Sequence, residues 1–263
     1  MVESSRTYLP AAGCDWRLPL YDPFVKLLGG DAARRALLDQ AVLRPGQRVL
    51  DVGCGTGTLA TLIKQLHPEV EVVGLDPDPK ALARARRKAE RAAVSVQFDH
   101  GFGDELPYPE ASFDRVFSSF MFHHLPAEEK GSTLREVRRV FKTGGEFYMM
   151  DFEGPHGVHG LLARVLHAKK TLADNAEDRV LSLMREAGLT DAKKVGRRTM
   201  LFGGVAYYRA SAGLGPSTSR RKRNRPLPAK LSRVSPNALG PALRTCNQDC
   251  HRQAGLERAK TTA

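Results

Sequence analysis

The chain has 263 residues, of which 41% are hydrophobic, and it carries a formal net charge of +12. This length and composition are typical of a soluble α/β domain of ordinary size and argue against a disordered chain. No apolar stretch approaches the roughly 20 residues that span a bilayer, and the N-terminus lacks the basic segment and apolar core of a secretory signal, so we expect a cytoplasmic protein without membrane insertion.

The positive charge is concentrated at the C-terminus. Residues 213–263 contain 11 Lys or Arg against 2 Asp or Glu, a net charge of +9 out of +12, so the preceding 212 residues are nearly neutral. This segment has no aromatic residue and includes the basic run Ser219–Arg225. Such a composition predicts a disordered tail. A basic tail binds phosphate non-specifically, but we expect a solvated segment without a specific nucleic-acid partner.

The first 40 residues form a Pro-broken segment followed by short helical stretches, Val25–Leu28 and Ala32–Gln40. We expect this segment to cover the sheet edge of the main domain, which we place at residues 41–212. Within that domain, apolar runs alternate with helix-like stretches, which is typical of a mainly parallel sheet with helices on both faces. The predicted strands are Arg48–Val52, Val70–Leu75, Val94–Phe98, Phe113–Phe120 and Glu146–Asp151.

The stretches between these strands carry helix signals. Thr58–Leu66 reads as the first helix, and the second begins where Asp78 can cap it and Pro79 occupies the first helical position. A third helix has apolar residues at helical spacing, and Gly144-Gly145 is predicted to end it. Its spaced apolar residues are Leu134, Val137, Val140 and Phe141.

The pattern changes after the fifth strand. Ala176–Ala187 predicts an amphipathic helix stopped by Gly188, and two extended segments follow, Lys193–Phe202 and Val205–Ala210, joined by Gly203-Gly204. The whole predicts a Rossmann-like α/β fold, a three-layer sandwich whose seven-stranded, mostly parallel sheet has one antiparallel strand from a C-terminal hairpin.

A glycine-rich turn directly follows the first predicted strand. In Val49–Gly57 the glycines are Gly53, Gly55 and Gly57, and a helix begins after them. Glycines let a ligand lie against the backbone, and the helix N-terminus favours an anionic group. The turn therefore predicts a pocket for a nucleoside-bearing cofactor.

The glycine spacing favours a methyl donor over a dinucleotide. The dinucleotide fingerprint is G-x-G-x-x-G, whereas here the spacing is G-x-G-x-G, and Asp51 precedes the first glycine by two residues. A carboxylate would repel a pyrophosphate but can face the ammonium of an amino acid. No Gly-Lys-Ser/Thr follows, which excludes a phosphate-binding P-loop.

Several ordered motifs resemble those of class I S-adenosylmethionine-dependent methyltransferases of the small-molecule type. The resemblance spans roughly residues 40–152. Besides the glycine turn, Val72–Pro77 resembles the acidic second motif, Leu106–Asp114 the loop and fourth strand, and Val140–Gly145 the turn before the fifth strand. The resemblance implies S-adenosyl-L-methionine as cofactor and a methyltransferase activity. The residues it implies for cofactor binding are Asp51, Gly53, Cys54, Gly55, Gly57, Asp76, Pro77, Gly103, Asp104 and Ser118.

Two positions depart from the family pattern. Many relatives place an acid that holds the adenine amine where this chain has Phe102. Asp104 or a backbone carbonyl can take over that contact, and Phe102 can pack against the ring. Thr143 replaces the usual proline before the fifth strand, a change expected to affect only local stiffness.

The acceptor side is predicted to follow the fourth strand. His123 and His124 are candidate bases near neutral pH, although capping or packing at the start of the next helix is the more common role for such histidines. Apolar candidates for the pocket wall are Phe120, Met121, Phe122 and Phe152, with Tyr21 and Phe24 from the N-terminal segment. These residues favour a small organic or lipid-like acceptor, and the atom that is methylated stays open.

Other functions compete with this interpretation. The basic tail prompts RNA or protein methylation, but Ser118-Ser119-Phe120-Met121 is not the Asn/Asp-Pro-Pro-aromatic motif typical of base methylation. A non-catalytic cofactor-binding scaffold and an NAD-linked oxidoreductase are alternatives from other classes. The four cysteines, Cys14, Cys54, Cys246 and Cys250, lack the paired clusters of a structural zinc site, so no metal is expected.

Overall fold

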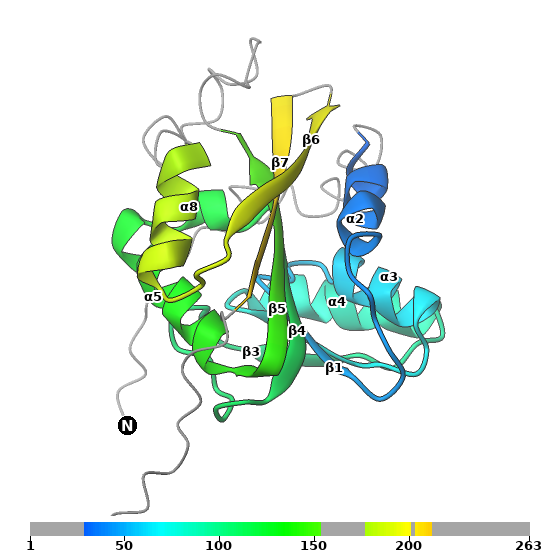
Figure 1. Cartoon of the computed structure of the whole chain (residues 1–263). Coiled ribbons are helices and arrows are strands. Elements are labelled where there is room, and N and C mark those ends of the chain that lie inside the picture. Colours follow the sequence, from blue (N-terminus) through cyan, green and yellow to red (C-terminus); the bar gives the residue numbers. More distant parts are fainter. Residues whose placement is uncertain (1–28, 154–176, 201–202, 212–263) are drawn as a thin grey trace, which may run out of the picture. The chain divides into compact units, whose positions relative to one another are not determined.

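A computed structural model describes residues 29–153, 177–200 and 203–211 (Figure 1). These residues build a seven-stranded sheet with the strand order β3-β2-β1-β4-β5-β7-β6. The strands are β1 Arg48–Val52, β2 Glu71–Asp76, β3 Gln97–His100, β4 Phe113–Ser119, β5 Phe141–Phe152, β6 Lys193–Met200 and β7 Gly203–Ser211.

The direction of the strands confirms the predicted fold class. Strands β1 to β5 pair in parallel, β7 pairs antiparallel with both β5 and β6, and β6 therefore runs with the first five strands. The chain order reverses between β1 and β4, because β2 and β3 lie on one side of β1 and the later strands on the other. In open parallel sheets, ligands bind at the carboxyl ends of the strands beside such a point.

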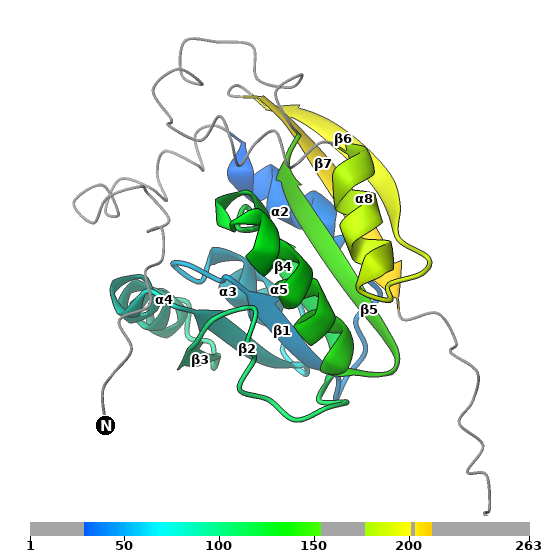
Figure 2. The same ribbon diagram turned by 90° about the vertical axis from the view of Figure 1, so that its left-hand side faces the viewer.

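Helices cover both faces of the sheet (Figures 1 and 2). One layer contains α2 (Gly30–Leu38), α3 (Thr58–Leu66) and α4 (Pro79–Arg91), and the other contains α5 (Ala127–Arg139) and α8 (Glu177–Glu186). Each layer closes its own apolar cluster: Leu37, Ile63 and Leu82 lie in one, Leu134 and Met184 in the other. Successive strand residues point to opposite faces of the sheet, so the strands contribute side chains to both clusters. The sheet and the two helix layers therefore form a three-layer sandwich.

The start of α4 follows the sequence prediction. Pro79 opens the helix, and the Asp78 carboxylate accepts a hydrogen bond of 2.8 Å from the Lys80 backbone N–H. The bounds of β1 and α3 are also as predicted, and α8 ends before Gly188, which has a φ of 86°.

The prediction for the end of the third helix is wrong. Helix α5 ends at Arg139, and Phe141 is already the first residue of β5, paired with Phe113. Gly144 and Gly145 lie inside β5, where the register with β4 shifts between Phe113 and Arg115. Phe141 keeps its place in the core, but it reaches the core from a strand, so its helical spacing after Val137 was misleading.

The other strand boundaries differ from the prediction by up to five residues, and the larger differences are at β3, at the start of β5 and at the hairpin. Strand β3 begins at Gln97 rather than Val94, because Val94 still donates its N–H to Ala89 O in the closing turn of α4. Gly203 and Gly204 are not the hairpin turn: they belong to β7 and pair with Met200 and Thr199.

Helix α2 is the described part of the N-terminal segment. It lies against the face of the sheet, where the Tyr207 hydroxyl donates to Ala33 O at 3.2 Å. The predictions for Val25–Leu28, Tyr21, Phe24, Cys14 and the tail 213–263 fall outside the described residues. Within the described part of the chain, no helix is both long and apolar enough to cross a membrane.

Candidate active site

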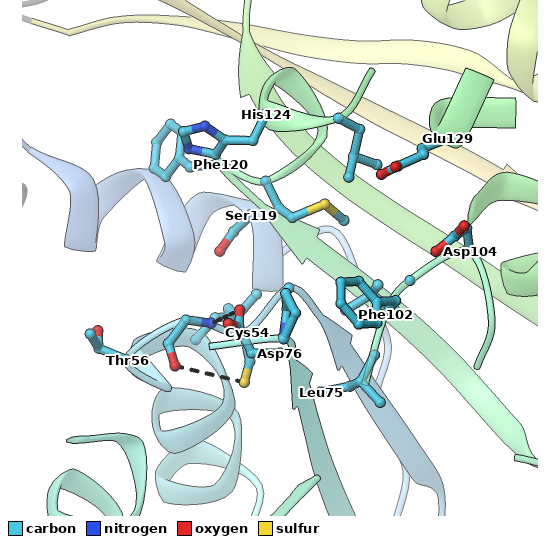
Figure 3. Close-up of a pocket in the computed structure, with 18 of the residues that line it drawn as sticks. Cys54, Thr56, Leu75, Asp76, Phe102, Asp104, Ser119, Phe120, His124 and Glu129 are labelled. Carbon is cyan, nitrogen blue, oxygen red and sulfur yellow. Dashed lines mark hydrogen bonds between the residues drawn. The ribbon is translucent and has the colours of Figure 1, made fainter. Parts of the chain in front are cut away.

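A cavity of about 280 Å³ lies at the carboxyl ends of β1, β2 and β4 (Figure 3). This is near the lower end of the about 300–1,000 Å³ range of small-molecule sites. Its lining combines the glycine turn, the end of β2, the β3–β4 loop, the segment after β4 and one helix α2 residue. The lining residues are Arg34, Val52, Gly53, Cys54, Gly55, Thr56, Thr58, Leu59, Leu75, Asp76, Pro77, Phe102, Gly103, Asp104, Ser119, Phe120, Met121, His124, Leu125, Pro126 and Glu129.

The three glycines of the turn have different roles. All have positive φ, between 53° and 72°. A Cβ at Gly57 would lie 2.7 Å from Ala85 Cβ, and one at Gly53 would lie 2.1 Å from Met121 Cγ, whereas a Cβ at Gly55 would meet nothing within 4 Å. Gly57 therefore permits helix packing and Gly53 permits contact with Met121. The space against the backbone is open at Gly55.

Asp76 ties this turn to the end of β2. Its carboxylate accepts hydrogen bonds from Gly55 N–H at 2.8 Å and from Asp78 N–H at 2.9 Å, and the residue is only 9% exposed. Burial raises the pKa of Asp76 to about 6, against the opposite effect of the two backbone donors. A carboxylate held in this way stays directed at the cavity and is ionised at neutral pH.

Asp51 is buried beneath the cavity rather than in its wall. One carboxylate oxygen accepts from Ala60 N–H at 3.2 Å, and the other has no partner among the described residues. Burial raises the pKa of Asp51 to about 7, and the positive charge of Arg34 opposes this shift. A buried carboxyl group therefore lies within the electrostatic influence of a buried positive charge, that of Arg34.

Arg34 is a pocket residue that the sequence reasoning missed. It is 5% exposed, its guanidinium lies 5.6 Å from the centre of the Phe120 ring, and its Nε has no partner in the described part of the chain. A signal was present, because Arg34 lies three and four residues before Leu37 and Leu38 and so falls on the apolar face of its helix. A charge on that face indicates a buried partner or ligand.

Two threonines at and after the glycine turn, Thr56 and Thr58, accept hydrogen bonds from a lysine of α4. Lys88 Nζ donates to Thr56 Oγ1 at 3.1 Å and to Thr58 Oγ1 at 2.5 Å. Cys54 also lines the cavity, and burial raises the pKa of its thiol well above the usual value. The Cys54 side chain is therefore a neutral, weakly polar part of the wall.

The β3–β4 loop forms the wall opposite the glycine turn. Phe102, Gly103 and Asp104 all line the cavity, and Phe102 lies near Asp76 and Leu75 in Figure 3. Phe102 and Glu105 form an isolated β-bridge that gives the loop a defined shape. An aromatic side chain thus occupies the wall where the family resemblance implies an acid.

The segment after β4 forms the apolar end of the cavity. Phe120 has a φ of 54°, a left-handed conformation that is strained for a residue with a bulky side chain. Its ring packs 4.9 Å from that of Phe152, and its N–H donates to Met150 O. These contacts hold the bend, and the cavity wall continues through Met121 and Leu125.

The two histidines that follow have different surroundings. His123 Nδ1 lies 2.6 Å from Asp151 Oδ1, and the His123 N–H donates to Asp151 Oδ2, so this residue is held away from the cavity. His124 lines the cavity, with its ring 3.9 Å from that of His123. Burial, and then the neighbouring His123, lower the pKa of His124 to about 3, which keeps it neutral.

Most of the predicted cofactor residues meet in one place. Gly53, Cys54, Gly55, Asp76, Pro77, Gly103 and Asp104 line the cavity, together with Phe120 and Met121 from the predicted acceptor wall. Asp51, Gly57, Ser118, Phe122 and Phe152 do not line it. Ser118 faces the α5 layer and Ser119 lines the cavity instead, because successive strand residues point to opposite faces. No metal-binding group of three or more His, Cys, Asp or Glu side chains occurs within the described ranges.

Comparison with known proteins identifies the family to which the chain belongs. Residues 49–145 match the model of a methyltransferase domain. A demethylmenaquinone methyltransferase of Thermus thermophilus is 40% identical over 151 residues, which are 56% of this chain and 68% of the relative. A 27-O-demethylrifamycin SV methyltransferase of Amycolatopsis mediterranei is 35% identical over 153 residues, 56% of this chain and 55% of the relative.

A solved structure shows the same fold. The phosphoethanolamine N-methyltransferase 2 of Haemonchus contortus, in complex with S-adenosyl-L-methionine, has a TM-score of 0.57 at 16% identity and covers 68% of this chain and 52% of its own. This chain thus spans between about half and two thirds of the length of these three proteins. The chain has the glycine turn, the acid at the end of β2 and the sheet order described above. It belongs to the class I S-adenosylmethionine-dependent methyltransferase family.

Proposed function

We propose that this chain transfers a methyl group from S-adenosylmethionine to a small organic or lipid-like acceptor. The observation that carries the proposal is the composition of one continuous cavity. Its glycine-turn end is polar and contains Gly55 and Asp76, whereas its other end is apolar and contains Phe120 and Leu125. Relatives named for demethylmenaquinone and 27-O-demethylrifamycin SV, both small molecules, support this acceptor class.

The polar end fits the donor. The open space at Gly55 allows close approach of a ligand, and the Asp76 carboxylate suits the two hydroxyls of a ribose. Arg34 in the cavity wall suits the carboxylate of an amino acid, and the buried Asp51 carboxylate beneath the wall suits the positive charge of its ammonium. Phe102 offers an aromatic face for the adenine ring. When bound, the donor supplies an activated methyl group on a sulfonium.

The protein's part in the reaction is to align the acceptor and exclude water. Phe120, Met121 and Leu125 provide a dry wall, and Arg34 keeps the Phe120 ring in place. For an acceptor that carries a hydroxyl, His124 is the residue we propose to receive its proton. Burial keeps the His124 ring neutral, the state in which it accepts a hydrogen bond from that hydroxyl, but the same lowered pKa makes it a weak base, so its candidacy rests on its place in the cavity wall.

The acceptor class is tested with donor carrying a labelled methyl group and with cell extract separated into small-molecule, protein and RNA fractions. We expect the label in the small-molecule fraction. Label in protein or RNA alone would overturn the proposed acceptor.

The role of His124 is tested with the substitution His124→Asn on the acceptor found in this way. Because general-base catalysis contributes about 10²–10⁴-fold, kcat should fall by about that factor while the Kd for S-adenosylhomocysteine stays unchanged. An unchanged kcat would remove His124 from the mechanism.

A further inference from the structure

The wall that contains Phe102 and Asp104 belongs to a loop, residues 101–112, that joins β3 to β4. A loop gives a ligand a defined surface only where other parts of the fold hold it. Its first part is shaped by the Phe102–Glu105 bridge, in which Glu105 N–H donates to Phe102 O at 3.3 Å. The next residue, Leu106, is 4% exposed, so its backbone groups need partners inside the protein.

Two side chains of α5 supply these partners. Glu136 Oε2 accepts from Leu106 N–H at 2.9 Å, and Arg139 Nη2 donates to Leu106 O at 3.0 Å. Arg139 Nη1 also donates to Tyr108 O at 2.7 Å. One ion pair therefore binds both the N–H and the C=O of Leu106. It fixes the backbone of this residue in the way that a neighbouring strand would.

The ion pair itself is held in a single geometry. Arg139 Nε and Nη2 lie 2.7 Å from the two carboxylate oxygens of Glu136, an arrangement that the planar guanidinium favours. The hydrogen bond from Arg139 lowers the pKa of Glu136, so the carboxylate stays ionised. A second anchor, from the Tyr108 hydroxyl to Asp99 Oδ2 at 3.0 Å, ties the loop to β3.

We propose that Arg139 and Glu136 are positioning residues for the adenine end of the donor pocket, an inference that rests on the proposed function. They lie on α5 and do not line the cavity themselves. By fixing Leu106 they hold the bridge between Phe102 and Glu105, and so keep Phe102 and Gly103 in the wall before the donor arrives. A loop ordered in advance loses less conformational entropy on binding.

The test uses Arg139→Ala and two ligands, S-adenosylhomocysteine and 5′-methylthioadenosine, titrated by calorimetry. The second ligand lacks the amino-acid end, so it reports on the adenosine end alone. We expect both affinities to fall by about tenfold, because only a fraction of the loops would then be competent to bind. Arg138→Ala is the matched control: Arg138 is exposed on the same helix and donates to Gly188 O, so both affinities should stay within about twofold of the wild type.

The outcomes separate this inference from the proposed function. A wild-type protein that binds neither ligand would contradict the proposed function itself. A wild-type protein that binds both, with an Arg139→Ala variant that is folded and binds equally well, would overturn the positioning role alone. If Arg139→Ala does not fold, Arg139→Lys keeps the charge but lacks the planar fork, and a loss of at least about threefold in both affinities is then the expected result. Unchanged affinities in that variant overturn the inference.

Discussion

Asp76 shows how a single carboxylate links the fold to the ligand site. It accepts backbone N–H groups from the glycine turn and from Asp78, so the ends of β1 and β2 stay together. Asp78, two residues on, has a different role, because its side chain caps α4. The sequence predicted the cap from the position of Asp78 before Pro79, and the family resemblance implied Asp76 as a cofactor-binding residue.

Substituting these two acids separates binding from stability. We expect Asp76→Asn to weaken S-adenosylhomocysteine binding by about tenfold or more, because a buried acceptor for the ribose hydroxyls is lost. Asp78→Ala should lower the free energy of unfolding by about 1 kcal/mol through loss of the cap, with affinity within about twofold of the wild type. Calorimetry and urea unfolding measure the two effects. Equal losses of affinity in both variants would contradict this assignment.

The buried acids also predict how donor binding depends on pH. The pKa values of Asp51 and Asp76 are raised to about 7 and about 6, and both acids are proposed to act as carboxylates. Affinity for S-adenosylhomocysteine should therefore fall as the pH is lowered from about 8 to about 5, by up to about tenfold per pH unit for each group. Titrations across this range test the prediction, and Asp76→Asn should flatten the lower part of the curve.

The raised pKa values of Asp51 and Asp76 also affect the free energy of unfolding. Whereas a higher pH strengthens donor binding, it weakens this effect of the two acids. Their pKa values are higher in the folded protein than in the unfolded chain, so the folded state binds more protons between about pH 4 and pH 7. Their contribution to the free energy of unfolding is fully present below about pH 4 and is lost as the pH rises through about 6 and 7. The stabilisation given by the ligand should therefore grow with pH, and a ligand effect that is independent of pH would contradict the proposed ionisation.

At the scale of elements, local signals predicted some boundaries and not others. Strand β1 and helix α3 flank the glycine turn, one directly before it and one directly after it, and their bounds were correct. Phe141 was wrongly placed in a helix, because its spacing from Val137 fits a helix although its pairing with Phe113 makes it a strand residue. Strand pairing between distant parts of the chain leaves no mark on local spacing, so the sequence could not reveal it. For Arg34 the position on the apolar face of its helix was a local signal, but its neighbours Phe120 and Asp51, which are distant in sequence, could not be identified from that signal.

Two helix ends allow a matched test of backbone strain. Helices α4 and α8 both end with a left-handed residue, which is Ala93 (φ 53°) in the first and Gly188 (φ 86°) in the second. Val94 N–H bonds back to Ala89 O, and Leu189 N–H to Met184 O, the same closing pattern in both. The two ends therefore differ mainly in whether the left-handed residue carries a Cβ.

We expect Ala93→Gly to raise the free energy of unfolding by about 1 kcal/mol, because Ala93 is exposed and glycine relieves the strain. Gly188→Ala should lower it by more than about 1 kcal/mol, since the new Cβ would be strained and would lie 2.6 Å from Arg138 Nε. Urea unfolding measures both. A destabilised Ala93→Gly variant would contradict the role assigned to this residue.

At the scale of the whole molecule, the sheet order brings together residues that the sequence only suggested were neighbours. The reversal between β1 and β4 places the glycine turn beside the segment that contains Phe120 and His124. The fold class and the family were predictable because each strand and turn has its own local motif. Which of Ser118 and Ser119 faces the cavity, and the burial of Asp51, depend on how the helix layers pack on the two faces of the sheet, which local motifs do not encode.

Calorimetric titration with S-adenosylhomocysteine and with NAD tests whether the cavity binds a methyl donor rather than a dinucleotide. We expect one molecule of S-adenosylhomocysteine to bind per chain and NAD not to bind, because the glycine turn and Asp51 suit an amino acid rather than a pyrophosphate. At a ligand concentration about 100 times the Kd, the bound protein should be stabilised by about 2.7 kcal/mol. Binding of NAD, or failure of S-adenosylhomocysteine to bind the folded chain, would contradict the assignment of this pocket to a methyl donor.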